Sequence, residues 1–485
     1  MLPPPSQPTS DRYWLESRRT FIGHGLSLGS IALASMFDSN SQAVAGASSL
    51  GNPVVSKPPH FVPRAKNVIQ LFMTGGPSHL DMFDYKPTLG ERDGQPLPDS
   101  VRRGVRFEQI RDAHPLLMGS RWKFRRCGQS GQWVATELLP HMSRVVDDLM
   151  FVRTVVTEET VHPRAEYLLN TGHRVAGRPS LGAWLLYGLG SESDNLPGYV
   201  VINSNGPTQG KQGNYHNGFL PSTFHGIELR SRGEPILNIT NPRGVTATDQ
   251  RQVVDAINKL NVLGQQRSGD PEIAARIAAY ELAFLMQSAA PELANLADES
   301  PATLALYGTD GKSPSLGRDC LLARRMVERG VRFVQIHYRD WDHHENIVRE
   351  HPIMCQAIDR ACAALVHDLK QRGLLDETLV IWGGEFGRTP VAQPQKEKIG
   401  QAGRDHHVNA FTMWLAGGGV KAGASVGETD EFGFHPVKDP VHVHDLQATI
   451  LHLLGVDHEQ LTYRYQGRDF RLTDVYGHVV EKMLA

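Results

Sequence analysis

Four side chains that could hold a metal ion lie beside expected strand ends in this 485-residue chain. Asp342 and His344 belong to the densest cluster of potential ligands in the sequence. Glu385 directly follows an expected strand, and His406 precedes another. Imidazole and carboxylate groups bind hard or borderline divalent cations without redox chemistry. Because ligands of an open α/β sheet gather at strand ends, we predict one divalent ion (Zn, Ca or Mn) held by these residues.

The turn after the first expected strand adds further candidates. Gly75 and Gly76 permit a tight turn and a close approach of the backbone to a bound group. Ser78 and His79 follow them and offer an oxygen and a nitrogen, so we predict that they bind substrate. Asp81 is the nearest carboxylate and is a fifth candidate metal ligand.

Each of these signals also has a purely structural interpretation. Glu385 alone would be a surface charge or the partner of a helix cap. Asp342 and His344 could form a capping and hydrogen-bond network. His406 and His407 are adjacent, so in an extended segment they point to opposite faces and at most one of them faces the site. The joint placement at separate strand ends favours the metal site.

The elements that must position these residues alternate between strand and helix. Short apolar runs predict strands at Asn67–Thr74, Leu149–Val156, Arg332–Tyr338, Thr378–Gly383 and Phe411–Ala416. Helical periodicity predicts helices at Pro271–Leu296, Ser315–Arg329, Ile347–Arg372 and His442–Leu454. Apolar strands joined by crossover helices form a parallel sheet that is covered on both faces. We therefore predict one α/β domain over residues 61–485, with a loop insertion near 203–250.

The amino terminus has the features of an export signal. Arg18 and Arg19 precede a mildly apolar run that ends in an Ala-x-Ala pattern, which is the order of a cleavable signal peptide. The arginine pair resembles a twin-arginine signal, which engages the machinery that exports folded proteins. We expect a signal peptide at 1–45, a linker at 46–60 and a periplasmic or extracellular location. No later run reaches the ~18 apolar residues of a membrane span, so no transmembrane anchor is expected in the mature chain.

Composition excludes several functional classes. Lys and Arg total 50 against 52 Asp and Glu, which gives a net charge of -2 and no basic surface for nucleic acid. The four Cys residues include no CxxC pair, which argues against a zinc ribbon or a disulfide scaffold. Gly423–Gly427 fits the G-x-S-x-G pattern, but turn residues follow it where a nucleophile elbow needs a helix. A serine hydrolase is therefore disfavoured.

Several motifs together resemble a bacterial family, DUF1501. They are Leu71–Pro87, the Trp341-Asp342-x-His344 cluster, Glu385–Pro390, Gly403–His406 and Ala416–Gly419. The resemblance extends from about Phe61 to the carboxyl end. That family is similar to a branch of the alkaline phosphatase and sulfatase superfamily, whose members hydrolyse phosphate or sulfate esters at a metal centre. Membership implies a three-layer α/β/α sandwich around a mostly parallel, mixed sheet.

The resemblance also implies roles for individual residues. Glu385 and Phe386 match an Asp-His metal motif, in which the carboxylate is kept and the imidazole is lost. His162 begins a segment that resembles the sulfatase signature, and it stands where a Cys, Ser or Thr nucleophile is found. In a hydrolase of this kind, Arg388 or Arg404 is expected to neutralise the charge that develops on the ester.

Two functions remain open at this point. In the first, Asp342, His344 and His406 match superfamily metal ligands, and the ion lowers the pKa of a bound water towards ~7. His162 then acts as a base or as a phosphohistidine-type nucleophile on a small-molecule or polysaccharide ester. In the second, the chain is an exported binding or cell-envelope protein without catalysis, as the missing nucleophile and Phe386 suggest. Purely structural roles for these groups would leave the same fold without an ion.

Overall fold

The computed structural model describes residues 53–485 apart from positions 104, 106, 112–113, 232–235, 237–238, 269 and 394–400. The expected signal peptide at 1–45, and the linker up to residue 52, lie outside the described residues. Within the described ranges, no helix is both long and apolar enough to cross a bilayer.

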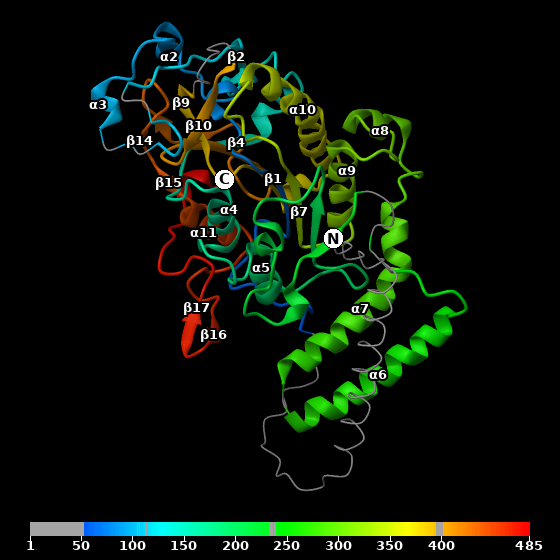
Figure 1. Cartoon of the computed structure of the whole chain (residues 1–485). Coiled ribbons are helices and arrows are strands. Elements are labelled where there is room, and N and C mark those ends of the chain that lie inside the picture. Colours follow the sequence, from blue (N-terminus) through cyan, green and yellow to red (C-terminus); the bar gives the residue numbers. More distant parts are fainter. Residues whose placement is uncertain are drawn as a thin grey trace, which may run out of the picture. The chain divides into compact units, whose positions relative to one another are not determined.

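In the described part of the chain, nine strands form one mixed sheet (Figure 1). The order is β12-β4-β11-β8-β1-β7-β5-β6, and β15 also pairs with β4. Only β11 runs antiparallel to its neighbours β8 and β4; the other described pairings in this sheet are parallel. The strands are β1 (Asn67–Met73), β4 (Leu149–Val156), β5 (Tyr199–Asn203), β6 (Ile227–Leu229), β7 (Phe333–Tyr338), β8 (Thr378–Gly383), β11 (Phe411–Ala416), β12 (Ser425–Val426) and β15 (Val441–His442).

Strand β1 illustrates why the sheet is buried on both faces. All seven of its residues are buried. Ile69, Leu71 and Met73 pack into a first core cluster, whereas Val68 and Phe72 pack into a second. Because side chains alternate between the two faces of a strand, this pattern requires covering elements on both sides.

Helices supply these covering layers. Helices α9 (Leu316–Val327) and α10 (Ile347–Gln371) contribute to the first core cluster. Helices α5 (Leu181–Leu189) and α11 (Val443–Leu453) contribute to the second. The predicted three-layer α/β/α arrangement with a mostly parallel, mixed sheet is therefore confirmed. The other α-helices of the described residues are α2 (Pro87–Glu91), α3 (Asp99–Arg102), α4 (His162–Thr171), α6 (Ala247–Ser268), α7 (Pro271–Ala294) and α8 (Pro301–Tyr307).

Short elements complete the described structure, and the pair β9–β10 is important because it carries candidate site residues. The two-stranded pairs are β2 (Phe124–Cys127) with β3 (Gln132–Ala135), β9 (Gly387–Gln393) with β10 (Gly403–His407), β13 (Glu428–Thr429) with β14 (Pro436–Lys438), and β16 (Tyr463–Tyr465) with β17 (Arg468–Phe470). The 3-10 helices are η1 (His79–Asp81), η2 (Met142–Arg144), η3 (Val146–Asp148), η4 (Lys211–Asn214), η5 (Ser222–Phe224), η6 (Leu375–Glu377) and η8 (Glu481–Met483).

The strands and helices expected from periodicity are confirmed, with every boundary within about two residues of the expected one. Residues 203–250, where a loop insertion is expected, contain η4, η5, the strand β6 and the start of α6. Strand β6 pairs in parallel with β5 over Ile227–Leu229 alone. A three-residue strand is too short for its alternation to be recognised in a sequence.

Candidate metal centre

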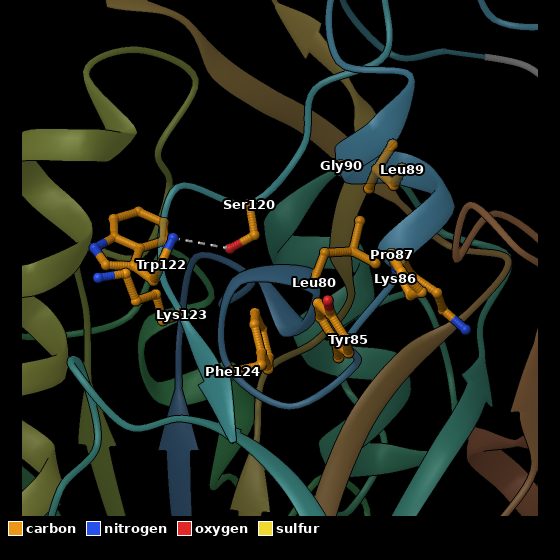
Figure 2. Close-up of a pocket in the computed structure, with 10 residues that line it drawn as sticks. All are labelled: Leu80, Tyr85, Lys86, Pro87, Leu89, Gly90, Ser120, Trp122, Lys123 and Phe124. Atoms are coloured by element: carbon orange, nitrogen blue, oxygen red, sulfur yellow. Dashed lines mark hydrogen bonds between the residues drawn. The ribbon is translucent and has the colours of Figure 1, made fainter. Parts of the chain in front are cut away.

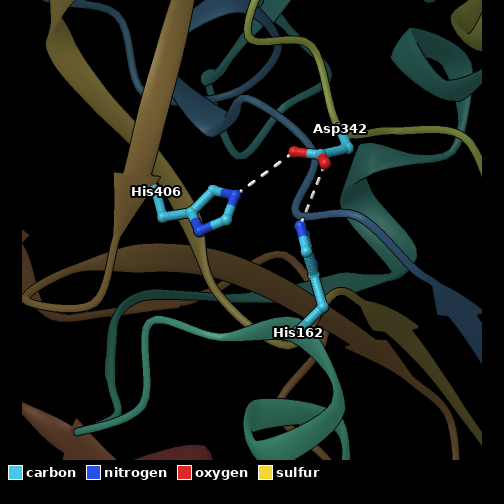
Figure 3. A group of neighbouring side chains, drawn as sticks. All are labelled: His162, Asp342 and His406. Atoms are coloured by element: carbon cyan, nitrogen blue, oxygen red, sulfur yellow. Dashed lines mark hydrogen bonds and ion pairs between the residues drawn. The ribbon is translucent and has the colours of Figure 1, made fainter. Parts of the chain in front are cut away.

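Segments far apart in the sequence bring polar side chains to one place. His162 is the first residue of α4, where Pro163 favours the start of the helix. Asp342 and His344 lie in the loop between β7 and α10, and His406 lies on β10. Figure 3 shows the rings of His162 and His406 directed at the Asp342 carboxylate.

Three imidazole rings surround the Asp342 carboxylate. The Nε2 atoms of His344 and His406 lie 2.9 and 3.2 Å from Asp342 Oδ1, and they are 2.9 Å from each other. His162 Nε2 lies 3.2 Å from Asp342 Oδ2. Ligand atoms bound to one tetrahedral ion at ~2.1 Å lie about 3.4 Å apart. The spacing therefore fits a set of metal ligands, and His162, Asp342 and His406 can all reach one ion.

The other nitrogen of each ring has a fixed partner. The pairs are His344 Nδ1 with Gln393 Oε1 (2.6 Å), His406 Nδ1 with the Thr160 carbonyl oxygen (2.6 Å) and His162 Nδ1 with Glu385 Oε1 (2.5 Å). All three partners are acceptors, so each Nδ1 donates its hydrogen, and in a neutral ring the Nε2 atom then keeps its lone pair. Acceptors that orient metal-binding histidines act in this way.

Glu385 lies behind His162. Its carboxylate is fully buried and accepts hydrogen bonds from the Gly75 backbone N–H at 2.9 and 3.2 Å, in addition to the bond with His162. Gly75 has a φ of +111°, and a Cβ atom there would lie 2.7 Å from the Asp342 backbone nitrogen. Glycine is therefore required where the turn after β1 passes the Asp342 loop. Glu385 orients His162 and does not share the space between the three Nε2 atoms.

Arg388 fixes the Asp342 carboxylate from the protein side. Its guanidinium is fully buried and donates to Asp342 Oδ1 at 2.6 Å. It also donates to the backbone carbonyl oxygens of Gly76 at 2.9 Å and Arg404 at 3.0 Å, and to that of Gly75. The guanidinium thus positions Asp342, and its N–H groups are already engaged within the protein.

The charges at the centre are strongly coupled. Burial lowers the pKa of His162, but hydrogen bonds to Asp342 and Glu385 outweigh burial and raise that pKa to about 9. Burial raises the pKa of Asp342, yet its hydrogen bonds with the three imidazoles hold it well below its usual range. The Asp342 side chain is 36% exposed and that of His344 is 16% exposed, so the centre is reached from the Asp342 side. An open position of this kind is typical of catalytic metal sites.

Four of the expected site residues lie together in a separate buried group, the Asp81 cluster. Arg404 Nε lies 2.8 Å from Asp81 Oδ2, and Ser78 Oγ donates to the same oxygen at 2.6 Å. The His79 ring stacks on that of His407 at 6.3 Å. These side chains are at most 2% exposed; Arg404 also donates to the Met118 and Thr389 carbonyl oxygens, whereas both ring nitrogens of His79 have no hydrogen-bond partner among the described residues. The structure thus brings His162, Asp342, His344, Glu385, Arg388 and His406 together and leaves Ser78, His79, Asp81 and Arg404 in their own cluster.

Glu166, which lies next to the centre, was missed by the sequence analysis. Glu166 lies one turn after His162 on α4, and its Oε2 accepts from the Gly210 N–H at 2.7 Å and from Asn214 Nδ2 at 2.8 Å. Burial and the neighbouring Glu385 carboxylate raise the pKa of Glu166 to about 7. The i, i+4 spacing from His162 is the signal that could have identified it.

Phe386 closes one side of the centre. Its ring centroid lies 4.8 Å from that of His162 and 4.4 Å from that of His406, and the side chain is buried. An apolar ring therefore packs against two of the three imidazoles. It supplies packing to the two rings and no ligand.

A cavity of about 320 Å³ lies apart from these residues (Figure 2). Its walls include the rings of Tyr85, Trp122 and Phe124, and the Lys86 ammonium at its edge is paired with Asp84 at 3.3 Å. None of the described lining residues belongs to the metal centre, and we assign no role to the cavity.

A comparison with protein families shows which family the chain belongs to. Residues 65–484 match the model described as "Protein of unknown function (DUF1501)". The chain belongs to the DUF1501 family. A comparison with curated proteins gave no match.

Solved structures with a similar arrangement come from enzymes of several kinds. The lipoteichoic acid synthase LtaP from Listeria monocytogenes is 9% identical, with 86% of this chain and 78% of that chain covered and a TM-score of 0.37. The PsFucS1 sulfatase from Pseudoalteromonas sp. is 12% identical, with 82% of this chain and 69% of that chain covered and a TM-score of 0.30. The alkaline phosphatase from the Antarctic bacterium TAB5 is 12% identical, with coverages of 80% and 98% and a TM-score of 0.29. These likenesses are distant.

Proposed function

We propose that this DUF1501 protein is a metal-dependent hydrolase of phosphate or sulfate esters. The observation that supports the proposal most directly is the meeting of three imidazole Nε2 atoms at the Asp342 carboxylate. Asp342, His344 and His406 would hold the ion, because their ligand atoms lie only 2.9 or 3.2 Å from one another. Three protein ligands leave one coordination position for water or substrate.

The remaining residues have separate tasks in this proposal. A divalent ion supplies a Lewis acid to an ester oxygen and lowers the pKa of a bound water. With the ion neutralising the Asp342 carboxylate, His162 would take up and return a proton at Nε2, and Glu385 would hold its ring by accepting the hydrogen of Nδ1. Arg388 keeps the Asp342 carboxylate in place. Because the proton acceptor is an imidazole, no Ser, Thr or Cys is needed at position 162.

The second candidate function is binding without catalysis. Two observations favour it: His162 stands where a nucleophile is expected, and the apolar Phe386 ring packs against His162 and His406. In this alternative the centre holds a cation that serves the fold or a binding surface of an exported protein.

Hydrolysis of aryl phosphate and aryl sulfate, with and without a chelator, separates the two functions. A hydrolase is expected to act on at least one ester, to lose that activity with chelator and to regain it when Zn²⁺ or Mn²⁺ is added. An Asp342→Ala variant should be inactive under all of these conditions. Asp376→Ala, which changes an exposed carboxylate in η6, is the matched control and should keep full activity. A protein that holds the ion but hydrolyses neither ester supports the binding function.

A further inference from the structure

Helix α6 carries an exposed apolar stripe that faces away from the rest of its hairpin. Val253, Leu260 and Leu263 are 50%, 57% and 49% exposed, and Ala256 between them is exposed as well. Val254 is the buried hydrophobic residue of this 22-residue helix. Scattered apolar side chains need no explanation, but a continuous stripe marks an interaction surface.

Contacts with α7 use another face of α6. Arg251 Nη1 lies 2.6 Å from Glu281 Oε2, and Asn258 also donates to Glu281, so the side of α6 that contains these residues faces α7. At 100° per residue, Val253 and Leu260 lie about 100° or more around the helix from Val254 and Asn258. The stripe therefore lies on a different side of α6 from Arg251 and Asn258, which face the neighbouring helix α7 (Figure 1).

The spacing of the stripe is that of a coiled-coil seam. Its members are Asp249, Val253, Ala256, Leu260, Leu263 and Arg267, all of them exposed. Successive members are separated by four, three, four, three and four positions, which is the repeat of the a and d positions of a heptad. Such a seam is completed by a second helix with the same repeat.

The stripe is also complementary to the same stripe of a second, antiparallel α6 helix. If two α6 helices pack antiparallel about a two-fold axis at position 258, Val253 faces Leu263 of the other copy and Ala256 faces Leu260. The same register places Asp249 opposite Arg267, so that unlike charges flank an apolar centre. A parallel pairing would instead place each charge opposite itself, which is unfavourable.

We propose that this protein dimerises through antiparallel pairing of α6 with the α6 of a second copy. A two-fold contact of this kind uses the same patch on both chains and closes on itself, so it gives a dimer and no longer assembly. The apolar part of the seam spans about 15 Å, because it covers ten residue steps of ~1.5 Å. So short a contact is expected to dissociate on dilution. The proposal does not depend on the function of the metal centre.

Sedimentation velocity over a dilution series tests the proposal. The protein is expected to sediment with twice the mass of one chain at high concentration and as a monomer after dilution. Leu260→Glu/Leu263→Glu should be monomeric at every concentration, with unchanged helix content by circular dichroism. Leu285→Glu changes an exposed leucine on α7 and should dimerise like the parent protein. A parent protein that is monomeric throughout, or a dimer that survives the double substitution, overturns the proposal.

Cysteine crosslinking tests the direction of the helices. In a Cys127→Ser background, Ala256→Cys/Leu260→Cys should form an intermolecular disulfide on mild oxidation, whereas Leu260→Cys alone should not. The other three cysteines are buried and should not interfere. Efficient crosslinking by Leu260→Cys alone would show a parallel pair and would contradict the antiparallel register.

Discussion

The Nε2 atoms of His344 and His406 lie 2.9 Å apart, and both face Asp342 Oδ1. Their Nδ1 atoms already have the acceptors Gln393 and Thr160, so two lone pairs point at each other and at a carboxylate oxygen. Gln109 Nε2 lies 3.2 Å from His344 Nε2, and Arg388 donates to Asp342 Oδ1 at 2.6 Å. A cation between the three atoms, either a proton or a metal ion, would add to these contacts. A dication would satisfy all three groups at once.

The first prediction concerns the ion itself. Metal analysis should find close to one divalent ion per chain, and a His344→Ala/His406→Ala variant should lose it. An ion that binds only the folded state stabilises that state by about 2.7 kcal/mol when the ion concentration is 100 times its Kd. Added ion should therefore raise the Tm of the parent protein but not that of the double variant. The matched control His173→Ala/His367→Ala changes one half-buried and one exposed histidine outside the candidate centre and should keep the ion. Equal ion content in both double variants would contradict the ligand set.

The second prediction separates a proton acceptor from a ligand at His162. His162→Gln should retain the ion, because Asp342, His344 and His406 remain, while its kcat for aryl ester hydrolysis falls about 10²- to 10⁴-fold. Metal analysis and steady-state kinetics on the same sample give both values. Loss of the ion together with the activity would show that His162 is a ligand and that its proposed role is wrong.

The third prediction concerns the buried pair of Asp81 and Arg404, which are 1% and 0% exposed. Asp81→Asn should leave the ion content unchanged but destabilise the fold by about 3–5 kcal/mol, since it leaves the Arg404 charge unpaired in the interior. Urea denaturation and metal analysis measure the two effects. A variant that loses the ion at unchanged stability would make Asp81 a ligand, as the sequence analysis expects.

Much of the fold could be predicted because its strands are buried on both faces. Strand β8 (Thr378–Gly383) reads as an uninterrupted apolar run, and α10 (Ile347–Gln371) shows a clear helical period, so both were placed within a residue. Strand β6 (Ile227–Leu229) has three residues, of which Leu229 is buried, and offers no period to detect. Its position depends on pairing with β5, which is a tertiary effect.

Residue type and position along the chain also predicted part of the grouping of the candidate residues. Residue type and strand-end position identified Asp342, His344 and His406, which the structure brings within 3.2 Å of one another. The same criteria also selected Asp81 as a ligand. They could not show that the Asp81 carboxylate forms a buried ion pair with Arg404. The partners that fix the imidazoles include a backbone carbonyl and an amide side chain, and no local pattern distinguishes these from ordinary polar groups.

The fourth prediction concerns export, which rests on residues outside the described structure. Arg18→Lys/Arg19→Lys should keep the protein in the cytoplasm, because the twin-arginine machinery reads the arginine pair and not its charge. Cell fractionation of tagged protein measures the distribution. Arg12→Lys changes a nearby arginine of the same segment and should be exported normally. Export of the paired variant at the normal level would show that the signal was wrongly identified.

The fifth prediction concerns stability at acidic pH. Burial, together with nearby charges, lowers the pKa of His79 to about 4 and that of His407 to about 3. In the unfolded chain both histidines titrate near 6.5. Below this pH the unfolded state therefore binds protons that the folded state does not, so the free energy of unfolding decreases as the pH falls from about 6.5 towards 4.

The His79→Leu variant lacks one of the two histidines that take up a proton in the unfolded state but not in the folded state. Between pH 7 and pH 4 the variant should lose roughly 3 kcal/mol less stability than the parent protein, the equivalent of the His79 pKa shift. Urea denaturation with chelator present measures this without a contribution from the metal centre. His367→Leu, at an exposed histidine, should follow the parent curve. If the His79→Leu variant loses as much stability as the parent protein between pH 7 and pH 4, the His79 ring accepts a proton in the folded state. Its burial against His407 then does not keep it neutral.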